Sequence, residues 1–488
     1  MNGATIVSCR CILDHHSWEW IRTYGPRRRF SLAESLWSCG PGIDPMACSE
    51  LQGTAQNWIW IERMTLAALP TDAAATDQQP TVVDFPATVE SKASPLSVVD
   101  KEPEEKRPYP PPAALPTQTG PLGIRFDFNL GARVVIPEGK PWRVRLRDLD
   151  TGNILFESSP GAGFINSTKR YYLRMSMEVL DGAGTVFHHE YDATKEHVLI
   201  QFPVGTLGDT MGWFPYAVKF QEQHNCKLTC AMSGLLIPLF KDAYPHIDFV
   251  THEEVKAEKF YATYSIGLFF DDEDRIWQPC DFRHVGLHRT AGYILGVDPT
   301  EMPPKLGIKD DGPPIAEPYV CIAVQSTTQS KYWNNPNGWR ELVTFLKTKG
   351  YRVICIDQKP THGFGLVWNH TPNGVEDQTG DRPLAERIRW LRHAKAFVGL
   401  SSGLSWLAWA AGAPVVMISG FTHPTNEFAT PYRVINYHAC NSCWNDVRVR
   451  FDHKDFLWCP RHANTPRQFE CTRLITAGQV ISVLNKIV

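Results

Sequence analysis

The 488-residue sequence contains no uninterrupted apolar run of the roughly 18 residues that a membrane-spanning helix needs. Its most apolar stretch, residues 403–418, is broken by Ser405, Gly412 and Pro414. The first 30 residues also lack the apolar core of a secretory signal, since acidic residues and several arginines occur among them. From these absences we expect neither an integral membrane protein nor a conventionally secreted one.

The sequence also lacks an excess of charge of either sign. It carries 49 Lys and Arg against 52 Asp and Glu, so we expect no dominant surface for nucleic acid or for an anionic membrane. The 13 cysteines are an odd number without a secretory signal, which argues against a disulfide framework and for reduced thiols in the cytoplasm. A chain of this length predicts two to four domains of about 150 residues each.

The first 114 residues show no sustained hydrophobic period of either a helix or a strand. Residues 66–120 are rich in Pro, Ala, Thr, Asp and Glu, a composition typical of linkers. Cys9 and Cys11 resemble half of a metal site, but no second pair with suitable spacing follows them. We therefore predict that residues 1–114 form a poorly ordered extension and a Pro-rich linker.

Residues 115–197 alternate between apolar and polar side chains, with turn sequences between the runs. This pattern predicts a small antiparallel β domain. Asp148 and Asp150 resemble the start of a calcium-binding loop, but the glutamate needed at its twelfth position is missing. We interpret this stretch as a hairpin turn.

From residue 198 onward, continuous apolar runs alternate with helical patterns. Residues 319–324 are apolar throughout, and residues 198–202 are apolar except for Gln201, as expected of strands buried on both faces. The alternation occurs in two blocks and predicts two Rossmann-like α/β domains, at residues 198–315 and 316–488. Ligands of such domains bind at the carboxyl ends of the strands.

Polar loops follow three of these strands. Residues 205–209 include two glycines and Asp209, residues 325–333 include several hydroxyls and Lys331, and residues 401–403 open a helix. Backbone amides, hydroxyls and a lysine at such positions suit a diphosphate. Taken alone, the first loop is better explained as a strand–helix turn with Asp209 as the helix N-cap, and the second is equally well explained as a polar loop with a solvated lysine. The D-x-D triplet of residues 272–274 we interpret as a solvated turn.

Four cysteines near the C-terminus carry the most specific motif. Cys440 and Cys443 form a C-x₂-C pair, and Cys459 and Cys471 follow within the same short segment. This spacing predicts a tetrahedral thiolate metal site in a finger over residues 438–472, and spacing alone favours zinc. His438, His453 and His462 are further candidates for ligands. Four unrelated thiols or a redox C-x-x-C are the alternatives.

These loops together resemble a known family. The segments at residues 198–215, 326–333 and 401–406 are similar to those of the ADP-heptose-dependent heptosyltransferases of lipopolysaccharide assembly. The preceding β domain and the Cys-rich tail make the chain more similar to the bacterial autotransporter heptosyltransferases. The resemblance covers residues 115–488 and implies a GT-B fold of two Rossmann-like domains, with the small antiparallel β domain ahead of them and a C-terminal Cys₄ metal finger.

The resemblance also implies a set of site residues, with Asp209 as the catalytic base. The donor-binding residues that it implies are Thr206, Leu207, Gly208, Ser326, Thr327, Lys331, Asp357, Ser402, Gly403 and Leu404. Of these, Asp357 is the looser match and is expected near the ribose. The sequence departs from the lipopolysaccharide enzymes at Ser401, where they carry Asp, and at Trp406, where they carry His.

The expected activity is heptose transfer from ADP-heptose to Ser or Thr hydroxyls of an autotransporter adhesin. The resemblance implies one iron ion per subunit at Cys440, Cys443, Cys459 and Cys471, with zinc as the alternative, and no metal in the transfer chemistry. It implies a cytoplasmic protein that forms a large homo-oligomeric ring, such as a dodecamer, and binds no nucleic acid.

Two other functions compete with this one. The first is a lipopolysaccharide-core heptosyltransferase, against which the extra β domain, the Cys-rich tail and the changes at Ser401 and Trp406 argue. The second is a zinc-ribbon nucleic-acid-binding protein. Between Cys440 and Arg473, six Lys or Arg stand against four Asp or Glu, a balance that does not favour phosphate binding.

Overall fold

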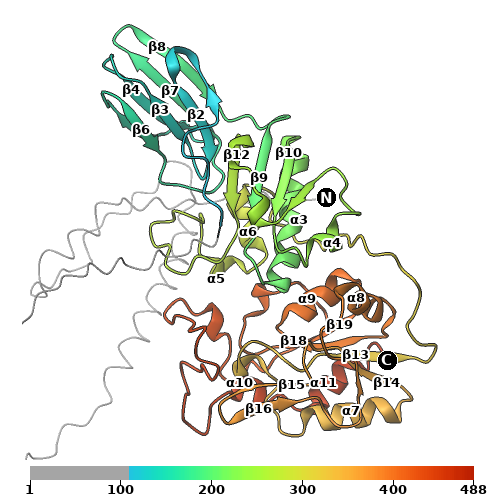
Figure 1. Ribbon diagram of the computed structural model, residues 1–488. Coiled ribbons are helices and arrows are strands. Elements are labelled where there is room, and N and C mark those ends of the chain that lie inside the picture. The colour runs from blue at the N-terminus through green and yellow to red at the C-terminus, as the bar shows by residue number, and fades with distance from the viewer. Residues whose placement is uncertain (1–108) are drawn as a thin grey trace, which may run out of the picture. The chain divides into compact units, whose positions relative to one another are not determined.

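The computed structural model describes residues 109–488, which belong to one compact unit (Figure 1). The predictions for residues 1–108, including the Cys9 and Cys11 pair, lie outside the described residues. Among residues 109–488, no helix is both long enough and apolar enough to cross a membrane.

An eight-stranded sheet forms the centre of the first half of this unit. Its strand order is β11-β10-β9-β12-β2-β3-β6, and β1 pairs with the outer part of β2. The strands are β1 (Gln118–Thr119), β2 (Arg125–Asn129), β3 (Arg133–Ile136), β6 (Gly163–Asn166), β9 (His197–Gln201), β10 (Lys227–Ala231), β11 (Asp248–Val250) and β12 (Ala262–Ser265). The strands β9 to β12 are parallel to one another, as the continuous apolar runs predicted.

The predicted small β domain divides between this sheet and a second one. The second sheet is antiparallel, in the order β5-β4-β7-β8, and consists of β4 (Arg143–Asp148), β5 (Ile154–Ser158), β7 (Met175–Asp181) and β8 (Gly184–Glu190). The antiparallel region is therefore present, and β4 and β5 form the expected hairpin. Its strand β2, however, pairs with β12 through Phe128 opposite Ala262 and Asn129 opposite Thr263. One sheet thus runs from the β region into the first Rossmann-like domain.

Helices of the first domain pack beside its parallel strands (Figure 1). They are α3 (Leu207–His224), α4 (Ile237–Phe240), α5 (Phe282–Val285) and α6 (Arg289–Leu295). The helix α3 buries large side chains such as Trp213, Phe214 and Phe220, each at most 1% exposed. Because α3 follows directly after β9, its first turn lies at the carboxyl edge of the sheet.

The second domain contains a six-stranded, fully parallel sheet in the order β17-β14-β13-β18-β19-β20. Its strands are β13 (Tyr319–Ile322), β14 (Arg352–Cys355), β17 (Glu376–Asp377), β18 (Phe397–Leu400), β19 (Val415–Ile418) and β20 (Arg433–Val434). Counted along the chain, this is the 3-2-1-4-5-6 order of a Rossmann domain. The sequence prediction of a second doubly wound domain agrees with this topology.

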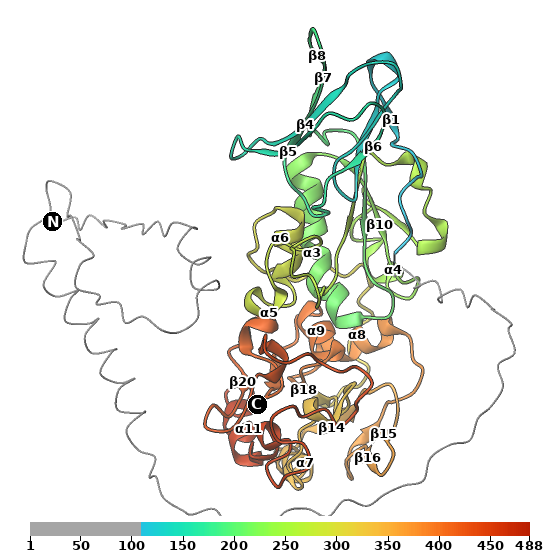
Figure 2. The same ribbon diagram turned by 90° about the vertical axis from the view of Figure 1, so that its left-hand side faces the viewer.

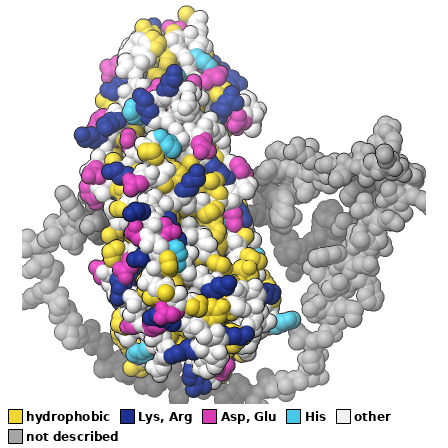
Figure 3. Space-filling model, turned by 90° about the vertical axis from the view of Figure 1, so that its right-hand side faces the viewer, with side chains coloured by type: hydrophobic (Ala, Val, Ile, Leu, Met, Phe, Trp, Pro, Cys, Tyr) yellow, Lys and Arg dark blue, Asp and Glu magenta, His cyan; other side chains and the backbone are white. Residues whose placement is uncertain are grey.

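The helices of the second domain are α7 (Gly338–Thr348), α8 (Leu384–His393), α9 (Gly403–Ala410), α10 (Glu470–Arg473) and α11 (Ala477–Leu484). The strands β15 (Thr361–Phe364) and β16 (Val367–His370) form a separate hairpin (Figure 2). This hairpin carries three exposed apolar side chains, namely those of Phe364, Leu366 and Trp368. On the face drawn in Figure 3, Lys and Arg side chains are mixed with Asp and Glu, and neither sign forms an extended patch.

The end of the predicted linker makes specific contacts. The Gln201 side chain donates a hydrogen bond to the Pro110 carbonyl, and Arg133 donates one to the Ala113 carbonyl. Ordered chain therefore begins before residue 115, where the linker was expected to end. The Pro-rich composition did not predict these contacts. Proline lacks an amide donor, but its carbonyl can still accept a hydrogen bond.

Candidate active site

Asp209 lies in the first turn of α3, at the carboxyl edge of the first domain's sheet. The N-cap position of the helix is Thr206, so Asp209 is not the N-cap that the sequence allowed as an alternative. Its carboxyl is half-buried, and burial raises its pKa, while the Lys331 ammonium acts in the opposite direction. A carboxylate with a raised pKa is a stronger base than an exposed one.

Lys331 reaches the same place from the second domain. It ends the short 3₁₀ helix Gln329–Lys331 that follows β13. Its Nζ lies 5.4 Å from the ring centre of Phe421 and 5.7 Å from that of Trp444. Burial lowers its pKa, and the carboxylates of Asp209 and Glu427 oppose this effect. Within the described residues this ammonium has no hydrogen bond or ion pair, so it is available for an anion.

The N-termini of α3 and α9 meet between the two domains. A Cβ atom on Gly208 would lie 2.9 Å from Trp406 Cδ1 and 3.1 Å from Gly403 Cα, so only glycine fits there. Trp406 is 4% exposed and packs against this junction. Two helix N-termini, each with free backbone amides, therefore share one small region.

Hydroxyls lie at both of these N-termini. The Oγ atom of Ser402 is buried and makes no hydrogen bond within the described residues. The Thr206 hydroxyl, in contrast, acts on the Asp209 carboxyl and helps to lower its pKa. Each hydroxyl belongs to the N-cap residue of its helix, and neither caps it. Buried polar atoms are normally satisfied, so the unpaired Ser402 hydroxyl is what a site for a polar ligand would leave.

The loop after β13 is held by the predicted finger. The Phe456 carbonyl accepts hydrogen bonds of 2.9 Å from both the Gln329 amide and the Thr328 hydroxyl. Ser326 is half-buried and Thr327 is exposed at the entrance of this loop. The remaining predicted donor residues, Leu207 and Leu404, lie half-buried beside the α3–α9 junction. The predicted base and most of the predicted donor-binding residues therefore come from facing segments of the two domains.

Asp357 differs from the other predicted donor residues. It is 1% exposed, and its carboxylate accepts hydrogen bonds from the Val324 amide at 2.7 Å and the Gln325 amide at 3.3 Å. Burial raises its pKa to about 6. In this arrangement Asp357 fixes the end of β13, and its contact with a ribose stays a prediction.

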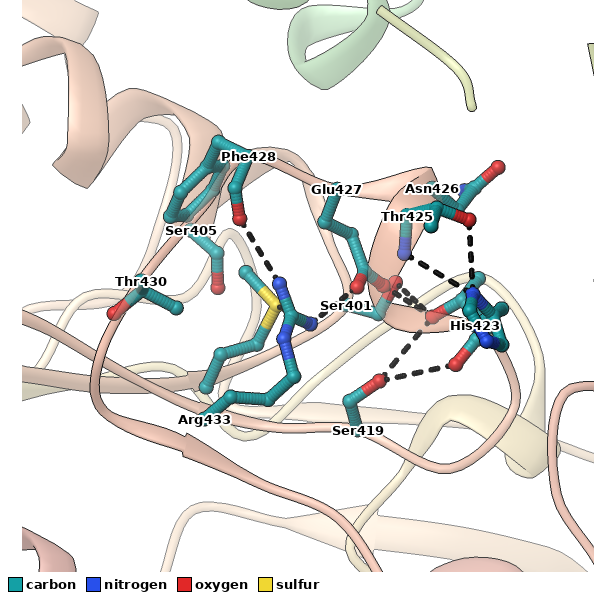
Figure 4. Close-up of polar contacts among 12 residues, drawn as sticks. Ser401, Ser405, Ser419, His423, Thr425, Asn426, Glu427, Phe428, Thr430 and Arg433 are labelled. Atoms are coloured by element: carbon teal, nitrogen blue, oxygen red, sulfur yellow. Dashed lines mark hydrogen bonds and ion pairs between the residues drawn. The ribbon is translucent and has the colours of Figure 1, made fainter. Parts of the chain in front are cut away.

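A polar network that the sequence did not reveal lies behind this site (Figure 4). The Glu427 carboxylate is 1% exposed, pairs with Arg433 and hydrogen-bonds to the Thr422 hydroxyl, which lies 3.0 Å from Ser401 Oγ. A carboxylate from a neighbouring loop thus reaches Ser401, the position at which the lipopolysaccharide enzymes carry Asp. A single glutamate in an irregular loop matches no motif, so pattern reasoning had no signal for it.

The D-x-D triplet forms a turn, but Asp272 is not solvated as expected. It is 6% exposed, and its carboxylate accepts hydrogen bonds from the amides of Ile276, Trp277 and Gln278. The correction follows from local geometry, because a carboxylate that satisfies three backbone donors can be buried within its own turn. The neighbouring Asp274 is exposed.

The four predicted metal ligands lie together. Cys440, Cys443, Cys459 and Cys471 line one cavity of about 20 Å³. Burial, together with the neighbouring thiols, raises the pKa of Cys443 and of Cys471 to about 12. A bound cation would reverse this effect, since metals favour thiolates. The residues that line this cavity therefore include thiol donors of the kind that bind a metal ion.

The structure adds two candidates to this set. The Sγ of Cys440, a ring nitrogen of His462 and a carboxylate oxygen of Glu470 lie within 4.8 Å of one another. Glu470 is already engaged, because it accepts hydrogen bonds from Arg467 and from the Cys440 amide. His462 was among the histidines considered as substitutes, whereas Glu470 was missed.

Known proteins resemble both halves of the described chain. Residues 120–183 match the N-terminal domain of glycosyltransferase TibC, and residues 296–450 match glycosyltransferase family 9 (heptosyltransferase). The autotransporter heptosyltransferase TibC of Escherichia coli O78:H11 is 54% identical over 378 residues, which are 77% of this chain and 92% of TibC. The inactive autotransporter heptosyltransferase BimC of Burkholderia thailandensis is 51% identical over 381 residues, 78% of this chain and 90% of BimC.

A solved structure agrees with these relatives. The crystal structure of the dodecameric iron-containing heptosyltransferase TibC in complex with ADP-D-β-D-heptose superposes with a TM-score of 0.74 and is 53% identical, covering 77% of this chain and 98% of that one. The GT-B arrangement of two Rossmann-like domains is therefore confirmed. Because a relative that is 54% identical matches 77% of this chain and 92% of its own length, the chain belongs to the autotransporter heptosyltransferases, a family of glycosyltransferases.

Proposed function

We propose that this protein transfers heptose from ADP-heptose to Ser or Thr hydroxyls of an autotransporter adhesin, with Asp209 as the general base. The observation that carries the proposal is the meeting of Asp209, from the first domain, with Lys331 and the N-terminus of α9, from the second. The relatives' names supply the substrate class, since TibC is an autotransporter heptosyltransferase that binds ADP-D-β-D-heptose.

The geometry supports the following chemistry. The Asp209 carboxylate takes the proton of the acceptor hydroxyl, and the hydroxyl oxygen forms a bond to the anomeric carbon of heptose. The bond between that carbon and the diphosphate oxygen breaks, and ADP leaves with the electron pair. Lys331 and the amides at the start of α9 stabilise the negative charge that develops on the diphosphate. General-base assistance of this kind is typically worth about 10²–10⁴-fold in rate.

Donor binding is assigned to the facing loops. Thr206, Leu207 and Gly208 border the sugar side, and Ser402, Gly403 and Leu404 border the phosphates, where the unpaired hydroxyl of Ser402 would find a partner. Ser326 and Thr327 join Lys331 around the diphosphate. We assign Asp357 to the ribose end of the donor, where it would act by fixing the loop that it hydrogen-bonds.

The C-terminal cysteines would hold one iron ion per subunit, with zinc as the alternative. TibC is iron-containing and dodecameric, and the Cys-lined cavity of this chain suits a single ion. The ion would tie the finger together, and Phe456 of that finger positions the loop that carries Lys331. The exposed apolar side chains of the β15–β16 hairpin favour assembly into a large homo-oligomer. A cytoplasmic location remains part of this proposal.

The decisive experiment replaces Asp209 by Asn. We expect transfer to an adhesin, followed by intact-protein mass, to fall by at least about 10²-fold, while calorimetry still detects ADP-heptose binding. The matched control is Asp274→Asn, since Asp274 is exposed and belongs to the D-x-D triplet. Undiminished turnover by Asp209→Asn would reject the assignment. Because BimC is 51% identical and inactive, turnover of the unmodified chain must be measured first.

A further inference from the structure

We propose that residues 109–116, called the strap below, form a wall on the acceptor side of the active site, with Tyr109 as a positioning residue for the acceptor peptide. The inference rests on the proposed function, because it requires that Asp209 activates an acceptor hydroxyl. It concerns a Pro-rich segment that precedes the β region and lies outside both matched domains, at residues 120–183 and 296–450.

The strap is attached at the edge where α3 begins. The Tyr109 hydroxyl donates a 2.7 Å hydrogen bond to the carbonyl of Ile266, which directly follows β12. The Gln201 side chain, at the end of β9, donates a 3.1 Å hydrogen bond to the Pro110 carbonyl. Both anchors are the last residues of parallel strands, or follow them immediately, and ligands of such sheets bind at this edge. The strap is visible in Figure 2 as the blue segment before β1.

The anchor at Gln201 is itself rigid. Gln201 is 1% exposed, and its side-chain oxygen accepts a 3.0 Å hydrogen bond from the buried Ser265 hydroxyl. One buried amide therefore spans β9, β12 and the strap. A third attachment, from Arg133 to the Ala113 carbonyl at 2.7 Å, holds the other end of the strap against β3.

Tyr109 has one defined position between these anchors. A Cβ atom on Gly267 would lie 2.8 Å from the Tyr109 hydroxyl oxygen, so that glycine leaves just enough room for the phenol. The ring also contacts His252 edge to face, with 6.2 Å between ring centres. The strap thus places an aromatic side chain at a fixed point beside the carboxyl edge.

Tyr109 is close to the base but is not an acid or base itself. Asp209 is near enough to add to the effect of burial, and together they raise the pKa of Tyr109 well above its ordinary value. The phenol therefore keeps its proton, which it donates to Ile266, and its oxygen can still accept a hydrogen bond. A peptide N–H beside the reacting Ser or Thr is the matching donor.

The domain to which each residue belongs indicates that the strap lies on the acceptor side of the active site. Lys331, Ser402 and Gly403, assigned to the phosphates, all belong to the second domain, whereas Asp209 and the strand ends under the strap belong to the first. A wall on the first domain next to the base faces the incoming hydroxyl and not the nucleotide. Tyr109 should therefore affect acceptor binding and leave donor binding unchanged.

Two independent perturbations of Tyr109 test this inference. Tyr109→Ala removes the ring. Gly267→Ala displaces it, because the added Cβ would lie 2.8 Å from the Tyr109 hydroxyl oxygen. Each should raise the KM for the adhesin about 10-fold or more, with the KM for ADP-heptose and the hydrolysis of ADP-heptose by water unchanged. Tyr109→Phe keeps the ring but loses the hydroxyl, so it should raise the KM for the adhesin by less than Tyr109→Ala does.

The controls separate this inference from the proposed function. Gly161→Ala is the matched substitution, since a Cβ there meets no atom within 4 Å. An unchanged acceptor KM in both Tyr109→Ala and Gly267→Ala, or equal rises of both KM values, would overturn the role of the strap. If the role of the strap is overturned but Asp209→Asn abolishes transfer, the proposed function is kept without the strap. If Asp209→Asn remains active, the proposed function and the role of the strap are both rejected.

Discussion

The junction of α3 and α9 allows a sharp prediction for Gly208→Ala. The new methyl carbon would lie 2.9 Å from Trp406 Cδ1, where ordinary contact begins at 3.4 Å. Because Trp406 is 4% exposed and closely packed, it has little room to turn away. We therefore expect the two helix N-termini to separate by about half an ångström, with Asp209 and Ser402 moving apart.

The effect on stability is the difference of two terms. Overpacking of a core typically costs about 1–3 kcal/mol, whereas Ala is favoured over Gly in a helix by about 1 kcal/mol. The free energy of unfolding should therefore fall by only about 0–2 kcal/mol. Activity is more sensitive, because a 1 Å misplacement of reacting groups can cost about 10²-fold, so we expect kcat to fall roughly 10-fold.

The assay compares kcat for transfer to an adhesin with the thermal unfolding midpoint of the same preparation. Gly182→Ala is the control, because a Cβ at Gly182 meets no atom within 4 Å, and it should match the unmodified protein in both measurements. A Gly208→Ala protein with full kcat would refute the reasoning, since it would mean that the close approach of the two helices is not needed for catalysis.

Two further predictions concern charge and metal. Lys331→Met should move the acid limb of the pH profile of kcat/KM to higher pH, because the lost ammonium no longer opposes the burial that raises the pKa of Asp209. Lys331→Arg keeps the positive charge and should leave this limb near its original position. Identical pH profiles for the two variants would contradict the coupling between Lys331 and Asp209. Cys440→Ser and Cys459→Ser should lose bound metal in elemental analysis and lower the unfolding midpoint, whereas Cys280→Ser, outside the cluster, should keep its metal.

Local patterns predicted the second domain well. The strand Tyr319–Ile322 follows from the short apolar run at residues 319–324, a pattern set by its own residues. The predicted base and Lys331 were placed together for a related reason. Loops after parallel strands share one edge of each sheet, so their position follows from topology alone.

The features that sequence reasoning missed depend on distant partners. Nothing near Phe128 indicates that it will lie opposite Ala262, and nothing near Glu427 indicates that Arg433 and Thr422 will enclose it. Pro110 lies in a segment with the composition of a linker, yet its carbonyl is held by Gln201 from a strand far along the chain. Asp272 was misjudged because acidic clusters are usually solvated, whereas three amides of its own turn surround it.

The pairing of β2 with β12 has a consequence for how the chain is made. The ribosome releases β2, at residues 125–129, long before β12, at residues 262–265, so the first sheet cannot close until both have emerged. Until then, the hairpin strands around β2 present an unpaired edge on which another nascent chain could pair. Contacts of such large sequence separation also slow folding. Synthesis rate and chaperone protection of residues 125–265 should therefore govern the yield of folded protein, and a chain shortened to begin at β9 would leave β12 as an exposed edge.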